Sequence, residues 1–285
     1  MTDTSPSLLP TAAPIRRGAR SVGRILLGFS GVAALALAWD LAIRFGGRTL
    51  LPSPAQVAAA IFELTRQGFL VRHVVASLFR VTWGFLLAVL LGVPLGIWLG
   101  WNRRARAAVA PLLELLRPIS PLAWIPIAIL WLGVGDASAI FIIFLGALFP
   151  ITLAAMNAVA KVPEIYFNAG RNFGLTRTDL VRRVIYPATV PQLLVGLRLA
   201  LGIAWLVVVA AEMIAVNSGL GFLIIDARNA GNRYDLVVAG MVLIGTIGLA
   251  LDAAIRRLER SRAVRWGFAA PASPAPRRPR LAPAR

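Results

Sequence analysis

The stretch NAGRNFGLTRTDLVRRVIYP, residues 168–187, concentrates the groups of this chain that could recognise another molecule. Four arginines, one aspartate and two glycines fall within twenty positions, although the sequence around them is apolar enough to lie in lipid. Ionisable groups are costly inside a bilayer, so this segment must face something other than lipid. Its composition favours contact with a partner, and the rest of the chain decides which elements position it.

Composition places the chain among membrane proteins. It has 285 residues, of which 58% are hydrophobic and 15% charged, and a mean hydropathy of +0.76. These values are typical of proteins with several membrane spans. The net charge of +18 would suggest nucleic-acid binding in a soluble protein, but the basic residues gather at the ends of apolar runs, so no nucleic acid is expected as a partner. The absence of cysteine excludes disulfides, thiolate metal sites and a cysteine nucleophile.

Apolar runs of about 20 residues, the length that crosses a hydrocarbon core, predict an all-α fold, a polytopic membrane bundle of about six transmembrane helices. The predicted spans are approximately 25–45, 74–100, 109–133, 137–160, 189–216 and 236–255. An arginine-bearing lead-in and the triplet Ala36-Leu37-Ala38 give the first run some features of a cleavable signal peptide. Its length favours an uncleaved membrane anchor instead.

The distribution of basic residues predicts the orientation of the bundle. With the N-terminus in the cytoplasm, the inner side receives the basic residues of the N-terminal segment, of 101–106, of 161–183 and of the segment after 255. The outer side receives Arg48, Arg66, Arg72, Arg228 and Arg233. This asymmetry is the positive-inside pattern, so we expect a multi-pass protein with both termini cytoplasmic.

The segments between and beyond the spans differ in character. Residues 52–68 predict a short amphipathic helix on the outer surface, and the glycine-rich segment 217–235 is also expected outside, where either could receive a soluble partner. The two ends, 1–20 and 267–285, are predicted to be disordered because proline, alanine and arginine dominate them. Residues 21–266 then form one transmembrane domain.

The loop 161–188 is expected to be cytoplasmic, and it is long for a connection without structure of its own. Pro163 followed by Glu164 suits the first turn of a helix, because proline leaves no donor unpaired there. Gly174 suits the end of that helix in a left-handed conformation. The first half of the loop therefore predicts a short helix and a glycine turn.

The second half of the loop predicts another short helix. Thr176 with Asp179 matches a capping box at its start, and Pro187 is predicted to end it. Such a helix–turn–helix would project from the membrane, with Phe173, Leu175 and Ile185 as apolar contacts among the arginines. The alternative interpretation is a solvated basic loop that only fixes the topology.

The spacing of Ala169, Gly174 and Pro187 resembles the signature loop of the membrane subunits of bacterial ABC importers, usually written E-A-A-x3-G-x9-I-x-L-P. The resemblance extends over about residues 22–266. Segments similar to the subgroup that imports nitrate, taurine and aliphatic sulfonates are LLPSPAQV, GFLLAVLLGVPLGIWLG, LRPISPLAWIPIAILWLGVG, GLRLALGIAWLVVVAAEM and SGLGFLIIDARN. The resemblance implies the type I ABC importer permease fold and a place in the bacterial inner membrane.

In that family the loop forms a coupling helix that contacts a cytoplasmic ATPase subunit. Carried over by position, the ATPase-coupling residues are Asn168, Ala169, Gly170, Gly174, Leu175 and Pro187. Arg177, in the same loop, is added to this set. Two of them depart from the family pattern, because Asn168 replaces the usual glutamate and Gly170 the second alanine. Asn168 excludes a salt bridge at that position. Gly170 costs a helix about 1 kcal/mol relative to Ala, so we expect this helix to depend on its partner for order.

The sequence assigns no catalytic residue, metal site or cofactor to this chain. A nucleotide-binding P-loop needs G-x4-G-K-[ST], and the only lysine, Lys161, stands between Ala160 and Val162. ATP and Mg are therefore expected on a separate ATPase. His73 is the only histidine and lies near the outer end of the second span, where a hydrogen-bonding role is more typical than that of a base.

Ionisable residues at membrane depth are the candidates for the substrate path. They are Asp40, Glu114, Arg117, Arg198, Glu212 and Asp252. Glu114 and Arg117 stand three residues apart and are expected to neutralise each other. Arg198 and Glu212 would lie about 21 Å apart along one helix, so they cannot pair within it. Both are kept as substrate-path candidates, with anchoring of the helix as the alternative for Arg198.

Three classes of function follow, of which an ATP-driven importer permease is preferred. An ion-coupled secondary transporter would need a buried relay of acids or histidines, and an intramembrane enzyme would need a metal cluster or a nucleophile with its base. The resemblance implies as partners cytoplasmic ABC ATPase subunits, a second permease copy in a homodimer, a periplasmic or lipid-anchored substrate-binding protein, and membrane lipids. It also implies a small oxyanion as substrate, with aliphatic sulfonate ahead of taurine and nitrate.

Overall fold

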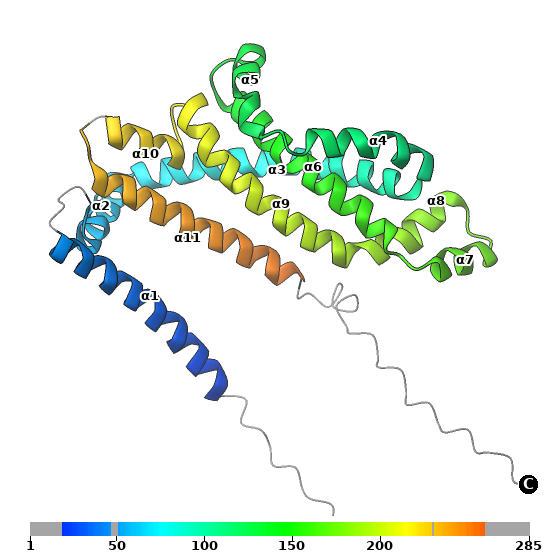
Figure 1. Ribbon diagram of the computed structural model, residues 1–285, viewed down its shortest axis with the longest axis horizontal. Coiled ribbons are helices and arrows are strands. Elements are labelled where there is room, and N and C mark those ends of the chain that lie inside the picture. The colour runs from blue at the N-terminus through cyan, green and yellow to red at the C-terminus, as the bar shows by residue number, and fades with distance from the viewer. Residues whose placement is uncertain (1–18, 47–50, 230, 260–285) are drawn as a thin grey trace, which may run out of the picture. The chain divides into compact units, whose positions relative to one another are not determined.

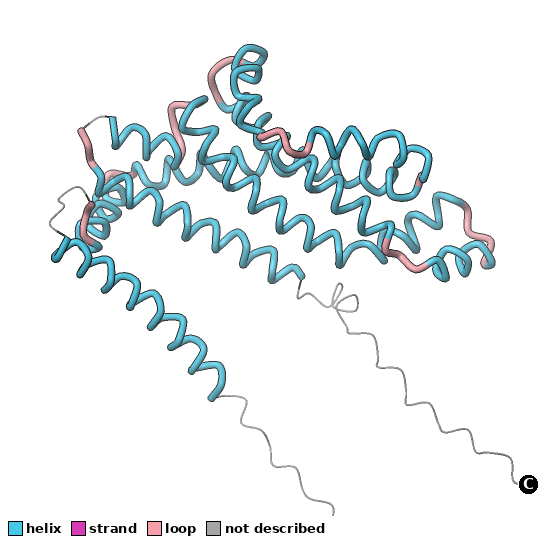
Figure 2. The backbone as a smooth tube through the Cα atoms, viewed as in Figure 1, coloured by secondary structure: helices cyan, strands magenta, loops and turns pink. Residues whose placement is uncertain are grey.

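The computed structural model describes residues 19–46, 51–229 and 231–259 of the chain. Regular structure in these residues is entirely helical, as the all-α prediction requires (Figures 1 and 2). The chain divides into two units, residues 1–59 and 60–285. The tail predicted to be disordered at 267–285 lies outside the described residues. Of the tail predicted at 1–20, only the last two residues are described.

The first unit contains helix α1, Ala19–Gly46, which covers the first predicted span, and the start of helix α2, Pro54–Arg66. Arg44 Nε lies 2.7 Å from an oxygen of Asp40 one turn earlier, so this acid is neutralised within its own helix. Helix α2 confirms the short helix predicted in 52–68. It begins with a capping box, in which Ser53 N–H donates to Gln56 Oε1 and Gln56 N–H donates to Ser53 Oγ.

Among the described residues of the second unit, four helices are long and apolar enough to cross a membrane. They are α3, Phe69–Trp101; α6, Asp136–Ala160; α9, Tyr186–Ala215, together with the short turns that precede it; and α11, Tyr234–Glu259. These helices confirm the predicted spans 74–100, 137–160, 189–216 and 236–255. Helix α10, Leu220–Asn229, lies within the glycine-rich segment 217–235.

The prediction that the span at 109–133 is continuous is wrong, because two helices with a bend between them cover this range. Helix α4, Arg103–Leu116, is followed by a 3₁₀ turn at Pro121–Trp124 and by helix α5, Ile125–Leu132, and the two parts are bent by 85°. Pro118 and Pro121 account for the break, since each removes a backbone donor and disfavours a helical conformation in the preceding residue. Apolar composition alone did not reveal the bend.

Helix α6 forms the centre of the second unit, packed against α3 on one side and α9 on another. Small residues of α3 repeat every fourth position and face α6; they are Gly84, Ala88, Gly92, Gly96 and Gly100. A Cβ atom on Gly84 would lie 2.7 Å from Ile143, and one on Gly96 would collide with the backbone oxygen of Thr152. This stripe lets the two backbones approach closely, which is how helices associate in the absence of a hydrophobic driving force.

Candidate functional site

Helix α7, Glu164–Asn172, forms the first half of the predicted coupling loop. It ends where Gly174 adopts φ 72°, with the Gly174 N–H donating to Arg171 O and the Leu175 N–H donating to Gly170 O. This pair of bonds is the Schellman arrangement, which satisfies the last carbonyls of a helix. No atom would lie within 4 Å of a Cβ on Gly174, so the backbone conformation is what requires glycine. The predicted left-handed stop is confirmed.

The start of the second short helix, α8, Arg177–Leu180, also matches the sequence-based expectation. The Thr176 hydroxyl accepts a hydrogen bond from the Asp179 N–H at 3.2 Å and lies 2.6 Å from Asp179 Oδ2. Thr176 therefore caps the helix, as the spacing of the two residues predicts. The Arg183 Nε lies 3.4 Å from Asp179 and is paired with it one turn later.

Pro187 does not end this helix, and that prediction is wrong. Helix α8 continues through a π turn, Val181–Ile185, directly into α9, so Pro187 occupies the first turn of a long membrane helix. The Tyr186 N–H donates to Val181 O, five residues back. A proline ring crowds the carbonyl four residues before it, and the wider π turn changes the hydrogen-bond register at that point. Helix α8 is therefore continuous with the membrane span.

Gly170 has a packing role that the sequence did not indicate. Helix α7 continues through it, and the residue is buried against α8. A Cβ atom at this position would collide with the end of the Leu180 side chain and lie 3.4 Å from Leu175 Cδ1. The glycine that weakens α7 as an isolated helix also allows α7 and α8 to approach each other.

One face of α7 is apolar and exposed. Residues on this face recur at helical spacing and are Ile165, Tyr166, Ala169 and Phe173, which we call the docking stripe. Phe173 is 85% exposed and Ile165 71%, so this face presents apolar surface that a partner could cover. Most of the predicted coupling residues are also exposed, namely Asn168, Ala169, Gly174, Arg177 and Pro187, whereas Leu175 is half-buried and Gly170 buried.

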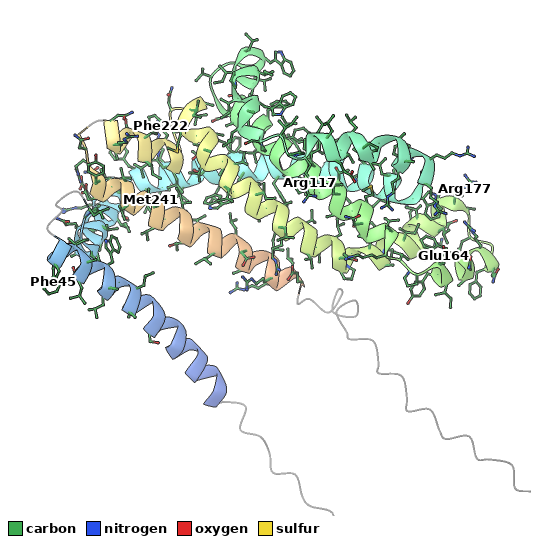
Figure 3. The ribbon with its side chains drawn as sticks, viewed as in Figure 1. Phe45, Arg117, Glu164, Arg177, Phe222 and Met241 are labelled. Carbon is green, nitrogen blue, oxygen red and sulfur yellow. The ribbon has the colours of Figure 1, made fainter. Side chains whose placement is uncertain are left out.

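A second charged site lies at the start of α10. Figure 3 shows Phe222 of α10 at the opposite end of the second unit from Glu164 and Arg177. Arg80 Nη1 of α3 lies 2.7 Å from Glu212 Oε1 of α9, and the two side chains are 3% and 0% exposed. Arg80 also donates to Asp136 Oδ1, at the start of α6, and to Ser218 O. We call these residues, with Ser77, the arginine cluster.

The arginine cluster fixes the beginning of α10. Three backbone N–H groups there donate to side chains of other helices: Gly219 to His73 Nδ1, Leu220 to Ser77 Oγ, and Gly221 to Glu212 Oε2. Ser77 Oγ in turn donates to Glu212 Oε2 at 2.9 Å. The free N–H groups of a helix N-terminus favour a carboxylate, and Glu212 provides it. The cluster thus joins α3, α6, α9 and α10 with its buried charges paired.

Comparisons with known proteins decide the family. Residues 92–264, more than half of the chain, match the family described as the binding-protein-dependent transport system inner membrane component. The chain belongs to this family of ABC importer permeases. The resemblance read from the sequence is confirmed.

Relatives and solved structures agree with this assignment. The permease is 36% identical over 217 residues to the taurine transport system permease protein TauC of Escherichia coli, covering 74% of this chain and 78% of TauC. It is 33% identical over 258 residues to the bicarbonate transport system permease protein CmpB of Synechococcus elongatus, covering 86% and 92%. A chain of the inward-facing MetNI methionine ABC transporter matches with a TM-score of 0.61 at 22% identity, covering 67% of this chain and 95% of that one, which shows the type I fold.

The two substrate-path candidates of the permease are both engaged by protein groups. Glu212 belongs to the arginine cluster. Arg198 lies on α9 with its Nη1 3.0 Å from Glu259 and its Nε 3.8 Å from Asp252, both on α11. Arg198 therefore holds α9 to α11 in this structure, which is the anchoring role considered as its alternative.

The predicted pairing of Glu114 with Arg117 does not occur in the structure. Arg117 is the C-cap residue of α4 and keeps a helical backbone, with its N–H donating to Leu113 O, so the three-residue spacing is present but does not bring the two charges together. Within the described part of the chain, neither residue makes an ion pair.

Arg80, Asp136 and Ser218 were missed by sequence reasoning. An available signal was that Arg80 lies inside the predicted span 74–100, since an arginine at membrane depth requires a partner. The partner, Glu212, is 132 residues away, and no periodicity links positions so distant. His73 takes the hydrogen-bonding role that was preferred for it, and its ring stacks beside Phe222 at 6.3 Å.

Proposed function

We propose that this permease is the membrane-spanning subunit of an importer for a small oxyanion, driven by a separate ATPase that docks on α7 and α8. The exposed docking stripe carries this proposal. A partner that covers Ile165 and Phe173 removes apolar surface from water, and burial of that kind is the main driving force for protein association. The glycine turn and the cap at Thr176 hold the stripe in one orientation.

The continuity of α8 with α9 supports a mechanical role for the loop. ATP binding would close two ATPase subunits and draw together the paired coupling loops of a permease homodimer. Because the π turn joins α8 to α9 without a flexible break, a displacement of the loop moves a membrane span directly. The bundle would then alternate between inward-facing and outward-facing states, with nucleotide on the partner as the ligand of the switch. ATP and Mg are assigned to that partner.

The orientation and the remaining partners belong to the same proposal. The positive-inside pattern supports a bacterial inner-membrane protein with both termini and the coupling loop in the cytoplasm. A periplasmic or lipid-anchored substrate-binding protein would then approach the side that carries α10.

The substrate class rests on likeness to relatives. TauC is named for taurine and CmpB for bicarbonate, which share a small oxygen-rich anionic group. We place aliphatic sulfonate first, with taurine and nitrate next. Ligand binding to the cognate substrate-binding protein tests this order, and the identity of the neighbouring genes would narrow it.

The docking proposal is tested by Gly174→Val and Gly174→Asn in the complex reconstituted in proteoliposomes. A β-branched residue cannot adopt φ near 72° without strain, whereas asparagine tolerates the left-handed region. We expect Gly174→Val to insert into the membrane but lose substrate-stimulated ATPase activity and ATP-driven uptake, and Gly174→Asn to keep both.

Gly245→Val is the matched control, because Gly245 lies in α11 without a positive φ, and a Cβ added there would meet no atom within 4 Å. Full ATP-driven uptake by Gly174→Val would show that the turn does not position the ATPase contact. Uptake that needs an ion gradient and no ATPase subunit would favour a secondary transporter.

A further inference from the structure

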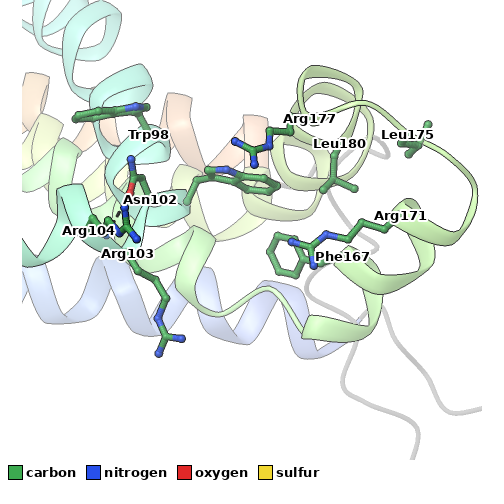
Figure 4. A pocket seen from close by; sticks show the side chains of 10 residues that line it. Trp98, Asn102, Arg103, Arg104, Phe167, Arg171, Leu175, Arg177 and Leu180 are labelled. Carbon is green, nitrogen blue, oxygen red and sulfur yellow. Dashed lines mark hydrogen bonds between the residues drawn. The ribbon is translucent and has the colours of Figure 1, made fainter.

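A pocket lies behind α7, between the coupling loop and the junction of α3 with α4 (Figure 4). Its volume is about 860 Å³. The lining residues are Trp98, Trp101, Asn102, Arg103, Arg104, Phe167, Arg171, Leu175, Arg177 and Leu180. The pocket combines cationic and aromatic side chains from two parts of the chain that are more than sixty residues apart in sequence.

The cations of this pocket lack acidic partners in the part of the chain that the structure describes. Arg103, Arg104, Arg171 and Arg177 make no ion pair with any described residue, and no carboxylate among these residues lines the pocket. Arg183, on the same loop but outside the pocket, does pair with a carboxylate, that of Asp179. In Figure 4 the guanidinium groups of Arg171 and Arg177 extend from the loop towards the side formed by Trp98 and Asn102. Four like charges that line one cavity without a carboxylate favour an anion as its ligand.

The start of α4 adds to the positive potential. Asn102 Oδ1 accepts hydrogen bonds from the N–H groups of Arg104 and Ala105, at 3.1 and 3.2 Å, which marks the N-terminal end of a 14-residue helix beside the pocket. A helix N-terminus carries a partial positive charge. The N-terminal end of α4 and the arginines of the pocket therefore both favour an anionic ligand.

The aromatic residues place the pocket at the boundary of the bilayer. The rings of Trp101 and Phe167 lie 5.7 Å apart, and Trp98, in the last turn of the membrane helix α3, is 53% exposed. Tryptophan is enriched where a span meets the headgroup layer. Exposed leucines of α3, including Leu91 and Leu95, lead from this point along the span, so an acyl chain has an apolar surface to follow.

The α7 residues that line the pocket lie away from the docking stripe, although Leu175 and Arg177, two of the predicted coupling residues, also line the pocket. At 100° per residue, Phe167 and Arg171 lie on the side of α7 opposite to Ile165, Ala169 and Phe173. A partner seated on the docking stripe would therefore leave this side of the helix uncovered.

We propose that this pocket binds a phosphate-class oxyanion, supplied by the headgroup of an anionic phospholipid in the inner leaflet. The leaflet assignment rests on the orientation given under the proposed function. Basic pockets at the cytoplasmic ends of membrane helices suit such headgroups, since arginine binds phosphate oxygens bidentately and the tryptophans suit the interface. A bound headgroup would join α7 to the start of α4 and fix the position of the docking stripe relative to the membrane.

The test measures lipid retention by the full-length permease with native mass spectrometry, without nucleotide or ATPase. The probes are short-chain phosphatidylglycerol, phosphatidylcholine as its zwitterionic counterpart, and inorganic phosphate as the soluble oxyanion. Arg103→Gln/Arg171→Gln removes two pocket charges. Arg182→Gln/Arg257→Gln removes two exposed charges that make no ion pair with a described residue and do not line the pocket, and it serves as the charge-matched control.

The wild type and the control pair are expected to retain phosphatidylglycerol over phosphatidylcholine, and the pocket pair to bind phosphatidylglycerol about tenfold more weakly or worse. Equal retention by the pocket pair and the wild type, or an equal loss in both pairs, would overturn the proposal. Binding of inorganic phosphate without phosphatidylglycerol would overturn the lipid source and support the oxyanion chemistry. Because the assay needs no ATPase, its outcome is independent of the Gly174 experiment.

Discussion

The two ends of the second unit use arginine in opposite ways. In the arginine cluster, Arg80 is buried and each nitrogen of its guanidinium donates to a protein acceptor, so it holds α3 to α6, to α9 and to the segment before α10. Around the coupling loop, Arg171 and Arg177 are exposed and have no carboxylate partner among the described residues. The comparison teaches that the presence of a protein partner, more than the residue type, distinguishes an arginine that stabilises the fold from one that is available to bind a ligand. Changes at the two ends should therefore affect different observables.

The largest expected effect is on stability at the arginine cluster. Glu212→Ala leaves the buried Arg80 side chain without its Glu212 partner and removes the acceptor for the Gly221 N–H. Breaking a buried ion pair on one side costs about 3–5 kcal/mol. Thermal unfolding of the purified permease in detergent should show a large loss of stability. Arg80→Gln/Glu212→Gln, which removes both charges, should recover part of it, and an unchanged midpoint for Glu212→Ala would contradict the structural role.

A smaller loss is expected at the start of α10. A Cβ on Gly221 would collide with the backbone oxygen of Val209, which cannot move aside as a side chain can. Gly221→Ala should therefore destabilise the protein by about 1–3 kcal/mol, the usual cost of overpacking. The comparison variant is Gly202→Ala, where no atom lies within 4 Å and the helical propensity of alanine should stabilise slightly. Equal unfolding midpoints for the two variants would contradict the close approach of α10 to α9.

At the coupling end, Phe173→Ala should separate binding from stability. The ring is 85% exposed, so its removal should change the free energy of unfolding by less than about 0.5 kcal/mol. If the docking stripe is an interface, the same change should weaken the ATPase subunit's affinity by about 2 kcal/mol, as aromatic residues at the centre of interfaces do. Calorimetric titration of the ATPase subunit measures this, and equal affinities would place the contact elsewhere.

The smallest effect is expected at Arg198. Its exposure is intermediate between that of the buried Arg80 and that of the exposed arginines of the coupling loop. Its side chain is 31% exposed and pairs with Glu259, so Arg198→Gln should cost about 1 kcal/mol or less. Uptake measured in proteoliposomes distinguishes the two roles considered for it. Anchoring alone predicts nearly unchanged uptake, whereas a substrate role predicts a raised KM for the anion.

Local rules succeeded where a few neighbouring residues decide the outcome. The turn at Gly174 and the cap at Thr176 follow from the conformational preferences of those residues, and the apolar runs located α3, α6, α9 and α11. Pro187 shows the limit of such rules. A proline usually ends a helix, yet the π turn before it accommodates the ring, and the sequence carries no recognisable signal for that turn.

Long-range geometry accounts for the remaining misses. The Arg80–Glu212 pair joins residues 132 positions apart, so it depends on how α3 and α9 pack. The role of Gly170 depends on the approach of Leu180 from the next helix. The two substrate-path candidates were chosen for their depth in the membrane, but depth does not reveal whether a charge already has a protein partner.

The central claim is that the docking stripe faces the cytoplasm and receives the ATPase. The chain contains no cysteine, so Ala169→Cys introduces a single thiol on the exposed face of α7. A membrane-impermeant maleimide should label it in inside-out vesicles and not in intact spheroplasts, and bound ATPase subunit should block the labelling. Labelling from the external side of intact spheroplasts, or labelling in inside-out vesicles that the ATPase leaves unchanged, would contradict the account.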